Sequence, residues 1–385
     1  MTTDGRGAVI SGIGISQIGR RLGIPGVDMT ESSSRQAIAD AGLEVSDIDG
    51  ITSLGDTPVT VAMELLGIEA QWRGGGVDNG GLLSPFMSAC QAVDTGLANH
   101  VLVYRTVQMI GGSILPAEGE APRSDEEKAV MESMDWVGPL LTMHAYSAAN
   151  WLAMHCRRHM YLYGTTKEQL GWLAVHSRKN AAVNPLAAYR DPLTLDDYLS
   201  ARPISDPFGL YDCDVPIDGS IALVISRADF APDAKNQAIK VEAFGGSSGA
   251  GAWDQRPDYP SMASVDAAKE MWSRTSLTPA DIDVAELYDG FTFLTLAWLE
   301  ALGLCGPGES GPFIEGGQRI ALDGELPLNT YGGQLSAGRM HGYWVLHEAA
   351  LQLRRQAGER QVKEPEVAIA AVGGGPIAGC VLLTR

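Results

Sequence analysis

Two absences in the sequence narrow the classes of protein that it can encode. No run of about 18 or more uncharged apolar residues occurs, the length that a helix needs to cross a bilayer. Residues 1–16, MTTDGRGAVISGIGIS, lack the basic segment, long apolar core and small-residue cleavage site of a secretory signal. We therefore expect a cytoplasmic protein with no membrane partner.

Cysteine and positive charge are both scarce. The five cysteines are odd in number and form no CxxC pair, which favours neither a disulfide framework nor a zinc knuckle. Lys and Arg total 28 against 47 Asp and Glu, a formal charge of −19. Because a protein that grips phosphate backbones needs a basic surface, we expect no nucleic-acid partner.

Signals for a metal or cofactor are weak. The segment HCRRH places His155 and His159 at the i, i+4 spacing of a helical metal pair, but no glutamate or third ligand accompanies them. The segment GIGISQIG lacks the strand, helix and acidic residue of a dinucleotide site. No lysine stands in an apolar loop, as a Schiff-base aldolase requires. We expect no metal and no cofactor.

The chain repeats itself loosely. Residues 34–49, SRQAIADAGLEVSDID, and residues 268–283, AKEMWSRTSLTPADID, each predict a helix that ends at a leucine, three residues before Asp-Ile-Asp. Each copy lies between a strand-and-glycine segment and a second apolar strand. Alternating strands and helices indicate α/β architecture, and doubling on this scale indicates two similar halves. We place them at residues 1–236 and 237–385.

One segment has no counterpart in the second half. Residues 107–205 begin with an acidic stretch, PAEGEAPRSDEEKAVMESMD, and continue with long helical patterns. A helix is expected to start at Thr165 or Thr166 in TTKEQLGWLAV. We interpret the segment as an excursion of the first half that covers the ligand site and contributes to dimerisation.

The order of several motifs carries a family resemblance. These motifs are GTTKEQLGWLAVHSRKN and its continuation to IALVIS (164–226), ELYDGFT (286–292), YGGQLSAGRMHG (331–342) and AVGGGPIAG (371–379). Together they resemble the thiolase superfamily, most closely its lipid-transfer-protein or sterol-carrier-protein branch, over essentially the whole chain. The resemblance implies an α/β thiolase fold, with two doubly wound βαβαβαββ halves in an α-β-α-β-α sandwich.

The resemblance breaks at the catalytic groups. Thiolases place a nucleophilic cysteine at a helix start, where the helix dipole lowers the thiol pKa. The matching position here is Asn79 or Gly80, and the nearest thiol, Cys90, lies about three helical turns further on. The second thiolase cysteine is replaced by Ala371, and the histidine of the GHPxG loop by Arg339. An acyl-enzyme intermediate is therefore not expected.

Tyrosines occur in two of the motifs that hold catalytic groups in thiolases. Tyr288 in ELYDGFT occupies a position that is Asn or His in related thiolases, and Tyr343 follows the glycine of GRMHG. The pattern resembles the steroid side-chain aldolases of the superfamily, which cleave a tertiary β-hydroxyacyl-CoA without an acyl-enzyme. We predict both tyrosines as catalytic, with His341 as a third polar group. A packing role is the plainer alternative for either tyrosine.

A retro-aldol reaction needs a base, an acid and an oxyanion hole, but no nucleophile. A phenol of unperturbed pKa about 10 suits a weakly acidic tertiary alcohol better than a carboxylate does. Glycines let backbone amides approach the thioester oxygen. The predicted oxyanion and CoA-binding residues are Gly373, Gly374, Gly375, Gly338, Gly342, Asn79 and Gly80.

The predicted function is an aldolase that cleaves a 17-hydroxy steroid side-chain acyl-CoA to a 17-ketosteroid and propionyl-CoA. The resemblance also implies a homodimer and a partner with a zinc-ribbon/OB-fold, linked to an enoyl-CoA hydratase. Basic residues between 157 and 190 could meet the CoA phosphates or form a solvated helix face. Two alternatives remain: an acetyl-CoA acetyltransferase-type thiolase that uses Cys90 or Cys380, and a non-catalytic acyl-CoA-binding scaffold.

Overall fold

The computed structural model describes residues 7–54, 57–75, 81–109, 138–248 and 253–385. Asn79, Gly80 and the acidic stretch of the excursion lie outside the described residues. The strands are β1 (Ala8–Ile15), β2 (Gly50–Ser53), β3 (Trp72–Gly75), β4 (His100–Gln108), β5 (Pro203–Ser205), β6 (Phe208–Gly209), β7 (Asp218–Arg227), β8 (Ile239–Ser248), β9 (Val284–Leu287), β10 (Val367–Gly374) and β11 (Ile377–Thr384). The α-helices are α1 (Gly26–Ala41), α2 (Val59–Leu66), α3 (Ser84–Thr95), α5 (Gly138–Thr142), α6 (Ala148–Tyr163), α7 (Lys167–Ala182), α8 (Leu195–Leu199), α9 (Ala263–Trp272), α10 (Thr292–Ala301), α11 (Ser310–Ile314) and α12 (Tyr343–Leu353).

One nine-stranded sheet runs through both halves, in the order β3-β2-β4-β7-β1-β8-β11-β10-β9. At its centre β1 and β8 pair antiparallel through Val9–Lys240 and Ile10–Ile239. Outward from β1, the first half has β7, β4 and β2, and outward from β8, the second half has β11, β10 and β9. In each half these are the last, the penultimate and the second strand that the half adds to this sheet. The same order on both sides confirms the two doubly wound halves predicted from the repeat. Beyond β9, a single parallel bridge joins Ala285 to Leu328.

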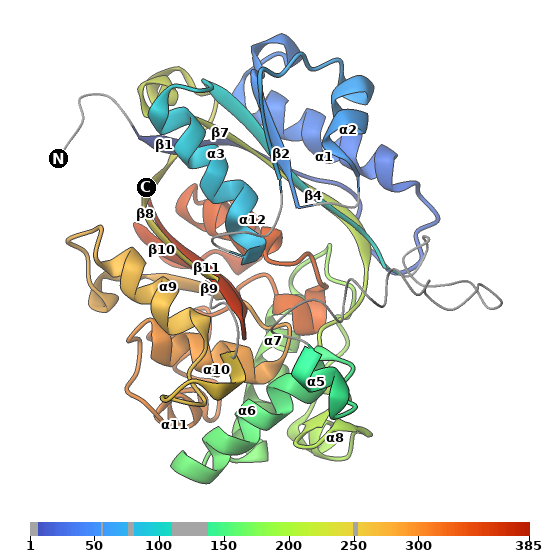
Figure 1. Ribbon diagram of the computed structural model, residues 1–385, viewed down its shortest axis with the longest axis vertical. Helices are drawn as coiled ribbons and strands as arrows, with labels where there is room; N and C mark the ends of the chain where they lie inside the picture. The colour runs from blue at the N-terminus through green and yellow to red at the C-terminus, as the bar shows by residue number, and fades with distance from the viewer. Residues whose placement is uncertain (1–6, 55–56, 76–80, 110–137, 249–252) are drawn as a thin grey trace.

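The helices form three layers: one outside each half of the sheet and one between the two halves. The outer helices are α1, which packs on β1, β7 and β4, and α9, which packs on β8 and β11. Helices α3 and α12 lie between the halves, because α3 contacts β4 and β8 while α12 contacts β10, β7 and β1 (Figure 1). The predicted α-β-α-β-α layering is therefore confirmed. Gly12 and Gly245 allow the close approach of the outer helices, since a Cβ at either position would overlap a helix carbonyl oxygen.

The repeated Asp-Ile-Asp has the same local cause in each half. The first aspartate of each copy closes a 3-10 turn: Asp47 accepts from Glu44 N at 2.8 Å, and Asp281 from Thr278 N at 2.7 Å. The second aspartate caps the start of the penultimate strand. Asp49 accepts from His100 N at 2.9 Å. Asp283 accepts from Val367 N at 2.9 Å. The motif therefore links the second strand of each half to the penultimate strand beside it.

The helical excursion packs on the second half. Its helix α7 starts at Thr166 with the predicted capping box, in which Thr166 Oγ1 accepts from Gln169 N at 3.2 Å. Three side chains on this helix and the residues after it donate to the carbonyls of a loop between α11 and α12: His176 to Leu328 at 2.9 Å, Asn180 to Asn329 at 3.1 Å and Asn184 to Tyr331 at 2.8 Å. The excursion thus holds the loop that leads to the candidate site.

Membrane-spanning helices need both length and apolar character. None of the helices in the described ranges is both long and apolar enough to span a bilayer.

Candidate active site

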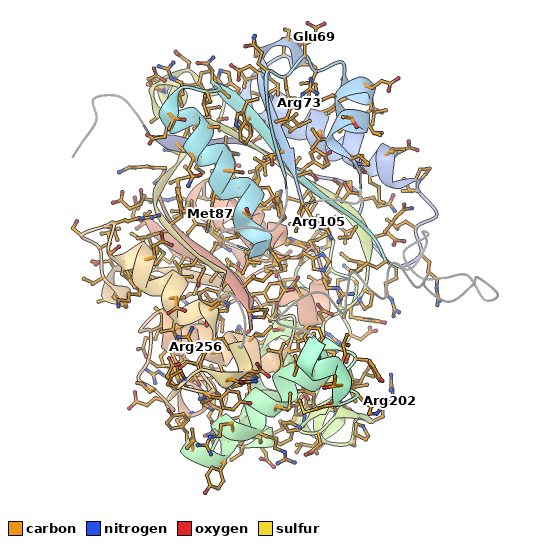
Figure 2. All side chains as sticks on the ribbon, viewed as in Figure 1. Glu69, Arg73, Met87, Arg105, Arg202 and Arg256 are labelled. Atoms are coloured by element: carbon orange, nitrogen blue, oxygen red, sulfur yellow. The ribbon has the colours of Figure 1, made fainter. Side chains whose placement is uncertain are left out.

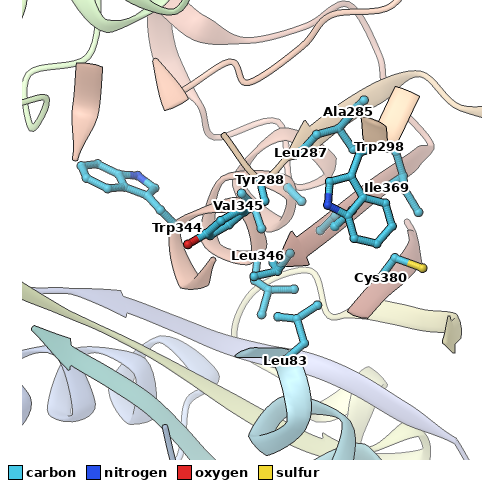
Figure 3. Packing of buried hydrophobic residues seen from close by; sticks show 14 of the residues in the cluster. Leu83, Ala285, Leu287, Tyr288, Trp298, Trp344, Val345, Leu346, Ile369 and Cys380 are labelled. Carbon is cyan, nitrogen blue, oxygen red and sulfur yellow. The ribbon is translucent and has the colours of Figure 1, made fainter. Parts of the chain in front are cut away.

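The loop after β9 brings Tyr288 beside a segment of the first half. Tyr288 N donates to Ala371 O on β10 at 2.8 Å, and Asp214 N donates to Gly290 O at 3.1 Å. Figure 3 shows Leu287 and Tyr288 next to α12, near Val345 and Leu346. The predicted residue Tyr288 is therefore fixed where β9, β10, α12 and the segment around Asp214 meet.

Asp289 shapes the loop opposite Tyr288. Its carboxylate accepts from Gln334 N at 2.7 Å and from Leu335 N at 3.3 Å, at the start of a π-helical turn, Gly333–Ala337. A Cβ on Gly333 would overlap the Asp289 carboxylate, so this close approach requires glycine. Burial raises the pKa of Asp289 to about 7, while the Gln334 and Leu335 amides oppose the shift. Its role is to hold the turn in place.

Arg339 occupies the position of the thiolase histidine and faces Asp214. Its Nη1 lies 3.3 Å from Asp214 Oδ1, and its Nε donates to Met109 Sδ at 3.1 Å. Burial raises the pKa of Asp214 to about 6, and the Arg339 guanidinium opposes that rise. The site therefore contains a carboxyl group that changes charge close to neutral pH.

The phenol of Tyr288 lies in the field of this pair. Burial raises the pKa of Tyr288 above its ordinary value, and the Asp214 carboxylate raises it further, whereas Arg339 lowers it. The side chain is 8% exposed. The hydroxyl is therefore protonated at neutral pH and is suited to donate a proton.

The phenol of Tyr343 has a different environment. Tyr343 is the first residue of α12, is fully buried, and its hydroxyl makes no hydrogen bond within the described part of the chain. Burial raises its pKa, and the Arg105 guanidinium of β4 opposes the rise. A buried hydroxyl without a partner is costly, so its retention is consistent with a ligand that completes its hydrogen bonding.

His341 also contacts Arg105. The Arg105 Nη2 lies 2.7 Å from His341 Nδ1, and His341 is half-buried with a left-handed φ of 48°. Burial, followed by Arg105 and Arg339, holds the pKa of His341 well below its usual value. The loop therefore presents a neutral imidazole between two guanidinium groups.

The predicted glycines lie in the loop before α12 and at the end of β10. Gly338 and Gly342 have φ of 135° and 92°, and a Cβ on either would overlap Ile217 or Val372. Gly373 and Gly374 end β10, and the N–H of Gly375 points to Met262 Sδ at 3.1 Å. Asn79 and Gly80 are outside the described residues.

A cavity of about 320 Å³ opens beside the pair of Asp214 and Arg339. Asp214, Val215 and Leu335 line its inner end, and Arg20, Arg178 and Tyr189 line another part. Both guanidinium groups lie 5.4 Å from the centroid of the Tyr189 ring. Tyr288 and Tyr343 are not among the lining residues, so this cavity does not contain the phenols.

The other candidate groups have structural partners. His159 Nε2 lies 3.0 Å from Glu300 Oε1, and no set of three His, Cys, Asp or Glu side chains in the described ranges could hold a metal ion. Cys90 in α3 and Cys380 in β11 are buried, and burial raises the pKa of each thiol. Neither thiol has the lowered pKa of a nucleophile.

Sequence reasoning missed Asp214 and Arg105. Asp214 lies in CDVPIDG, within a segment that matched the family, but nothing local distinguishes it from neighbouring acidic residues. Arg105 ends the apolar strand pattern HVLVYR, and a charged residue within a buried strand is a signal that could have identified it.

Comparisons with known proteins agree with this geometry. A family profile described as thiolase C-terminal domain-like matches residues 245–383. The chain is 34% identical to the steroid side-chain-cleaving aldolase of Thermomonospora curvata, with 97% of each chain covered. It is 33% identical to the 17-hydroxy-3-oxo-4-pregnene-20-carboxyl-CoA lyase of Mycobacterium tuberculosis, covering 97% of this chain and 98% of that one. A solved Ltp2-ChsH2(DUF35) aldolase superposes with a TM-score of 0.86 at 30% identity, over 98% of both chains.

Proposed function

The chain belongs to the thiolase superfamily, among the steroid side-chain-cleaving aldolases, and we propose on that premise which reaction it catalyses and with which residues. It is a carbon-carbon lyase. The proposed reaction is the retro-aldol cleavage of a 17-hydroxy steroid side-chain acyl-CoA to a 17-ketosteroid and propionyl-CoA, in steroid or sterol side-chain degradation. CoA is part of the substrate, and the reaction needs no further cofactor.

One observation carries the proposal. The positions of the second thiolase cysteine and of the thiolase histidine here hold Ala371 and Arg339, and two buried phenols lie on the same loops with different charged neighbours. Burial raises the pKa of both phenols, but their charged neighbours differ: the Asp214 carboxylate raises the pKa of Tyr288 further, whereas the Arg105 guanidinium lowers that of Tyr343. We assign the base to Tyr343, which faces Arg105, and the acid to Tyr288, which faces Asp214.

The steps balance in atoms and charge. Tyr343 enters the cycle as a phenolate, a form that burial disfavours and the Arg105 guanidinium favours. The phenolate accepts the proton of the β-hydroxyl, the oxygen forms a ketone, and the bond between the α and β carbons breaks. Its electron pair passes to the thioester as an enolate, which Tyr288 protonates at the α carbon. A proton must then return from Tyr343 to Tyr288 before the next turnover. General acid-base groups of this kind contribute about 10²–10⁴-fold each.

The glycine loop supplies the proposed oxyanion contact. The N–H of Gly375 faces a methionine sulfur, which is a weak acceptor that a thioester oxygen could replace. The left-handed φ values of Gly373 and Gly374, 85° and 140°, suit a backbone that approaches a ligand closely. Asn79 and Gly80 stay predictions for the same part of the site.

The cavity beside Asp214 is the proposed entrance for the CoA portion of the substrate. The guanidinium groups of Arg20 and Arg178 both lie over the Tyr189 ring in this cavity. Arginine binds phosphate and stacks on aromatic planes, so the arrangement suits the phosphate and adenine groups of CoA. Of the basic residues predicted for CoA, Arg178 lines this cavity, whereas Arg157 is paired with Asp206.

A partner protein is also part of the proposal. The solved relative is an aldolase of Ltp2 with ChsH2(DUF35), which supports the presence of a partner. We propose that the partner is of the zinc-ribbon/OB-fold type and is linked to an enoyl-CoA hydratase. A homodimer, a cytoplasmic location and the division of the halves between residues 236 and 237 are proposed with it.

The decisive experiment measures turnover of a 17-hydroxy steroid side-chain CoA thioester by the chain co-expressed with such a partner. We expect ketosteroid and propionyl-CoA in equal amounts, and losses of about 10²-fold or more in Tyr288→Phe and Tyr343→Phe. Tyr104→Phe is the matched control, because Tyr104 is equally buried but donates to Thr57 O at 2.8 Å. Acyl transfer to free CoA, or tight binding without turnover, would contradict the proposal.

A further inference from the structure

Arg105 joins the two halves at the candidate site. It lies on β4 of the first half, where it pairs with Ile221 of β7, and it is 7% exposed. Figure 2 shows it near the middle of the molecule. Its Nη2 reaches the loop before α12, in the second half, at 2.7 Å from His341 Nδ1. A buried guanidinium group of the first half therefore contacts an imidazole of the second half.

Counting hydrogens at this contact determines the state of the imidazole. A guanidinium group carries only donors and keeps its proton in proteins. At 2.7 Å, His341 Nδ1 must therefore accept with its lone pair. An imidazolium would place two N–H groups against each other, so the ring is neutral and its single hydrogen is on Nε2.

The charges near His341 also favour the neutral form of its ring. The charged groups that act on His341 are Arg105 from β4 and Arg339 from its own loop, and both oppose a positive ring. The backbone holds His341 at a φ of 48°, a left-handed conformation that is uncommon outside glycine, and Gly342 follows at 92°. Such strain is typically found where a side chain must point in one direction.

We propose that Arg105 fixes His341 as the Nε2-protonated neutral tautomer, so that His341 donates a hydrogen bond to the thioester oxygen of the substrate and does not act as a base. This inference rests on the proposed aldolase function. The thioester oxygen becomes negative as the carbon-carbon bond breaks, and a donor that is already oriented stabilises that charge. Arg105 is a positioning residue in this scheme.

Nitrogen-15 NMR of histidine-labelled protein tests the tautomer without any substrate. His341→Gln assigns the signals by difference. We expect a protonated Nε2 and an unprotonated Nδ1 that do not change between roughly pH 5.5 and 8.5, because no charged form is populated in that range. In Arg105→Met, the pKa of the same ring should rise toward its ordinary value of about 6.5 but stay below it, because burial and Arg339 remain. A wild-type His341 that titrates near that value, or that carries its hydrogen on Nδ1, overturns the proposal.

Kinetics test the donor role separately. His341→Leu should lower kcat by about 10²–10³-fold with little change in KM, as loss of one oxyanion donor does. His341→Gln keeps an N–H near the position of Nε2 and should recover at least about tenfold of that loss. Arg105→Met should lower kcat and add an acidic limb to its pH profile, at the midpoint that NMR gives for His341.

The outcomes separate this inference from the proposed function. Unaltered kcat in His341→Leu, with steroid-CoA turnover intact in the wild type, would reject the donor role even if the tautomer is confirmed. Absence of aldolase turnover in the wild type would instead reject the proposed function and, with it, the donor role, while the NMR result for Arg105 and His341 would stand. Circular dichroism and the Tm of each variant identify any that fail to fold.

Discussion

Arg339 Nη1 lies 3.3 Å from Asp214 Oδ1, across the gap between a segment of the first half and the loop before α12. The Asp214 side chain is only 9% exposed, and its backbone amide is bound to the loop that carries Tyr288. The contact is longer than a good ion pair, so the guanidinium offsets the burial of the carboxylate only in part. The burial of the Asp214 carboxylate therefore costs stability.

Asp214→Asn should stabilise the protein at neutral and alkaline pH. Burial raises the folded-state pKa of Asp214 to about 6. The stability that this group contributes to the protein is therefore present below its unfolded-state pKa and is lost as the pH rises through 6. At pH 8 the variant should gain on the order of 1–3 kcal/mol in unfolding free energy, and near pH 4 nothing, while turnover falls. Urea unfolding at both pH values measures this. Exposed Asp196 provides the control, Asp196→Asn, and equal stability of Asp214→Asn and wild type at pH 8 would contradict the prediction.

A second buried carboxyl group retains its proton behind the site. Thr330 Oγ1 lies 2.6 Å from Glu286 Oε1 and 3.0 Å from Glu348 Oε1, and Gln352 Nε2 donates to it at 2.9 Å. One hydroxyl hydrogen can serve only one carboxylate. Glu348 is ion-paired with Arg360 at 2.9 Å, so Glu286 holds the extra proton. Burial, and then the charge of Glu348, raise the pKa of Glu286.

Glu286→Gln should therefore become more stable than wild type as the pH rises. A raised folded pKa means that the stability from Glu286 is present below its unfolded pKa and is lost at higher pH, whereas an amide does not titrate. Thermal unfolding from acid to alkaline pH measures the difference, with Glu325→Gln at an exposed ion pair as the control. A Tm difference that does not depend on pH would show that Glu286 is not protonated in the folded state.

Gly342→Ala should destabilise the loop before α12. Its φ is 92°, and a Cβ would overlap the Val372 side chain. We expect a loss of about 2 kcal/mol or more, since crowding adds to backbone strain. Gly67→Ala is the matched control: Gly67 has φ of 78° with open space around its missing Cβ, and should lose only about 1 kcal/mol. Equal losses in the two variants would mean that Val372 moves aside without cost.

Cys90→Ala and Cys380→Ala should each keep aldolase turnover within about threefold, because a retro-aldol step requires no thiolate. Both thiols are buried with a raised pKa, so iodoacetamide should modify them slowly in the folded protein. Mass spectrometry of the modified protein, together with activity assays, measures both effects. Loss of activity on removal of one thiol would support the thiolase alternative.

The doubled fold could be predicted from the sequence because its signals are local. The Asp-Ile-Asp turns and the outer helices recur at equivalent places, and each makes contacts within a few elements of its own half. Tyr288 and Tyr343 were found because they stand at motif positions. Arg105 and Asp214 could not be placed, since each acts on a side chain more than fifty residues away in the chain. Such distances come only from the three-dimensional arrangement of the two halves, and whether the predicted side chains are catalytic stays for kinetics to decide.

The joining of the halves at Arg105 and at Asp214 implies a division of labour between the duplicated copies. The second copy carries the groups proposed to exchange protons or bind oxygen: Tyr288, His341 and Tyr343. The first copy contributes two of the charges that act on their pKa values, Arg105 and Asp214, and Arg339 of the second copy contributes a third. A substitution in the first copy can therefore retune the chemistry while every reacting group stays in place. Duplication thus gave this fold a way to change acidity and reactivity independently.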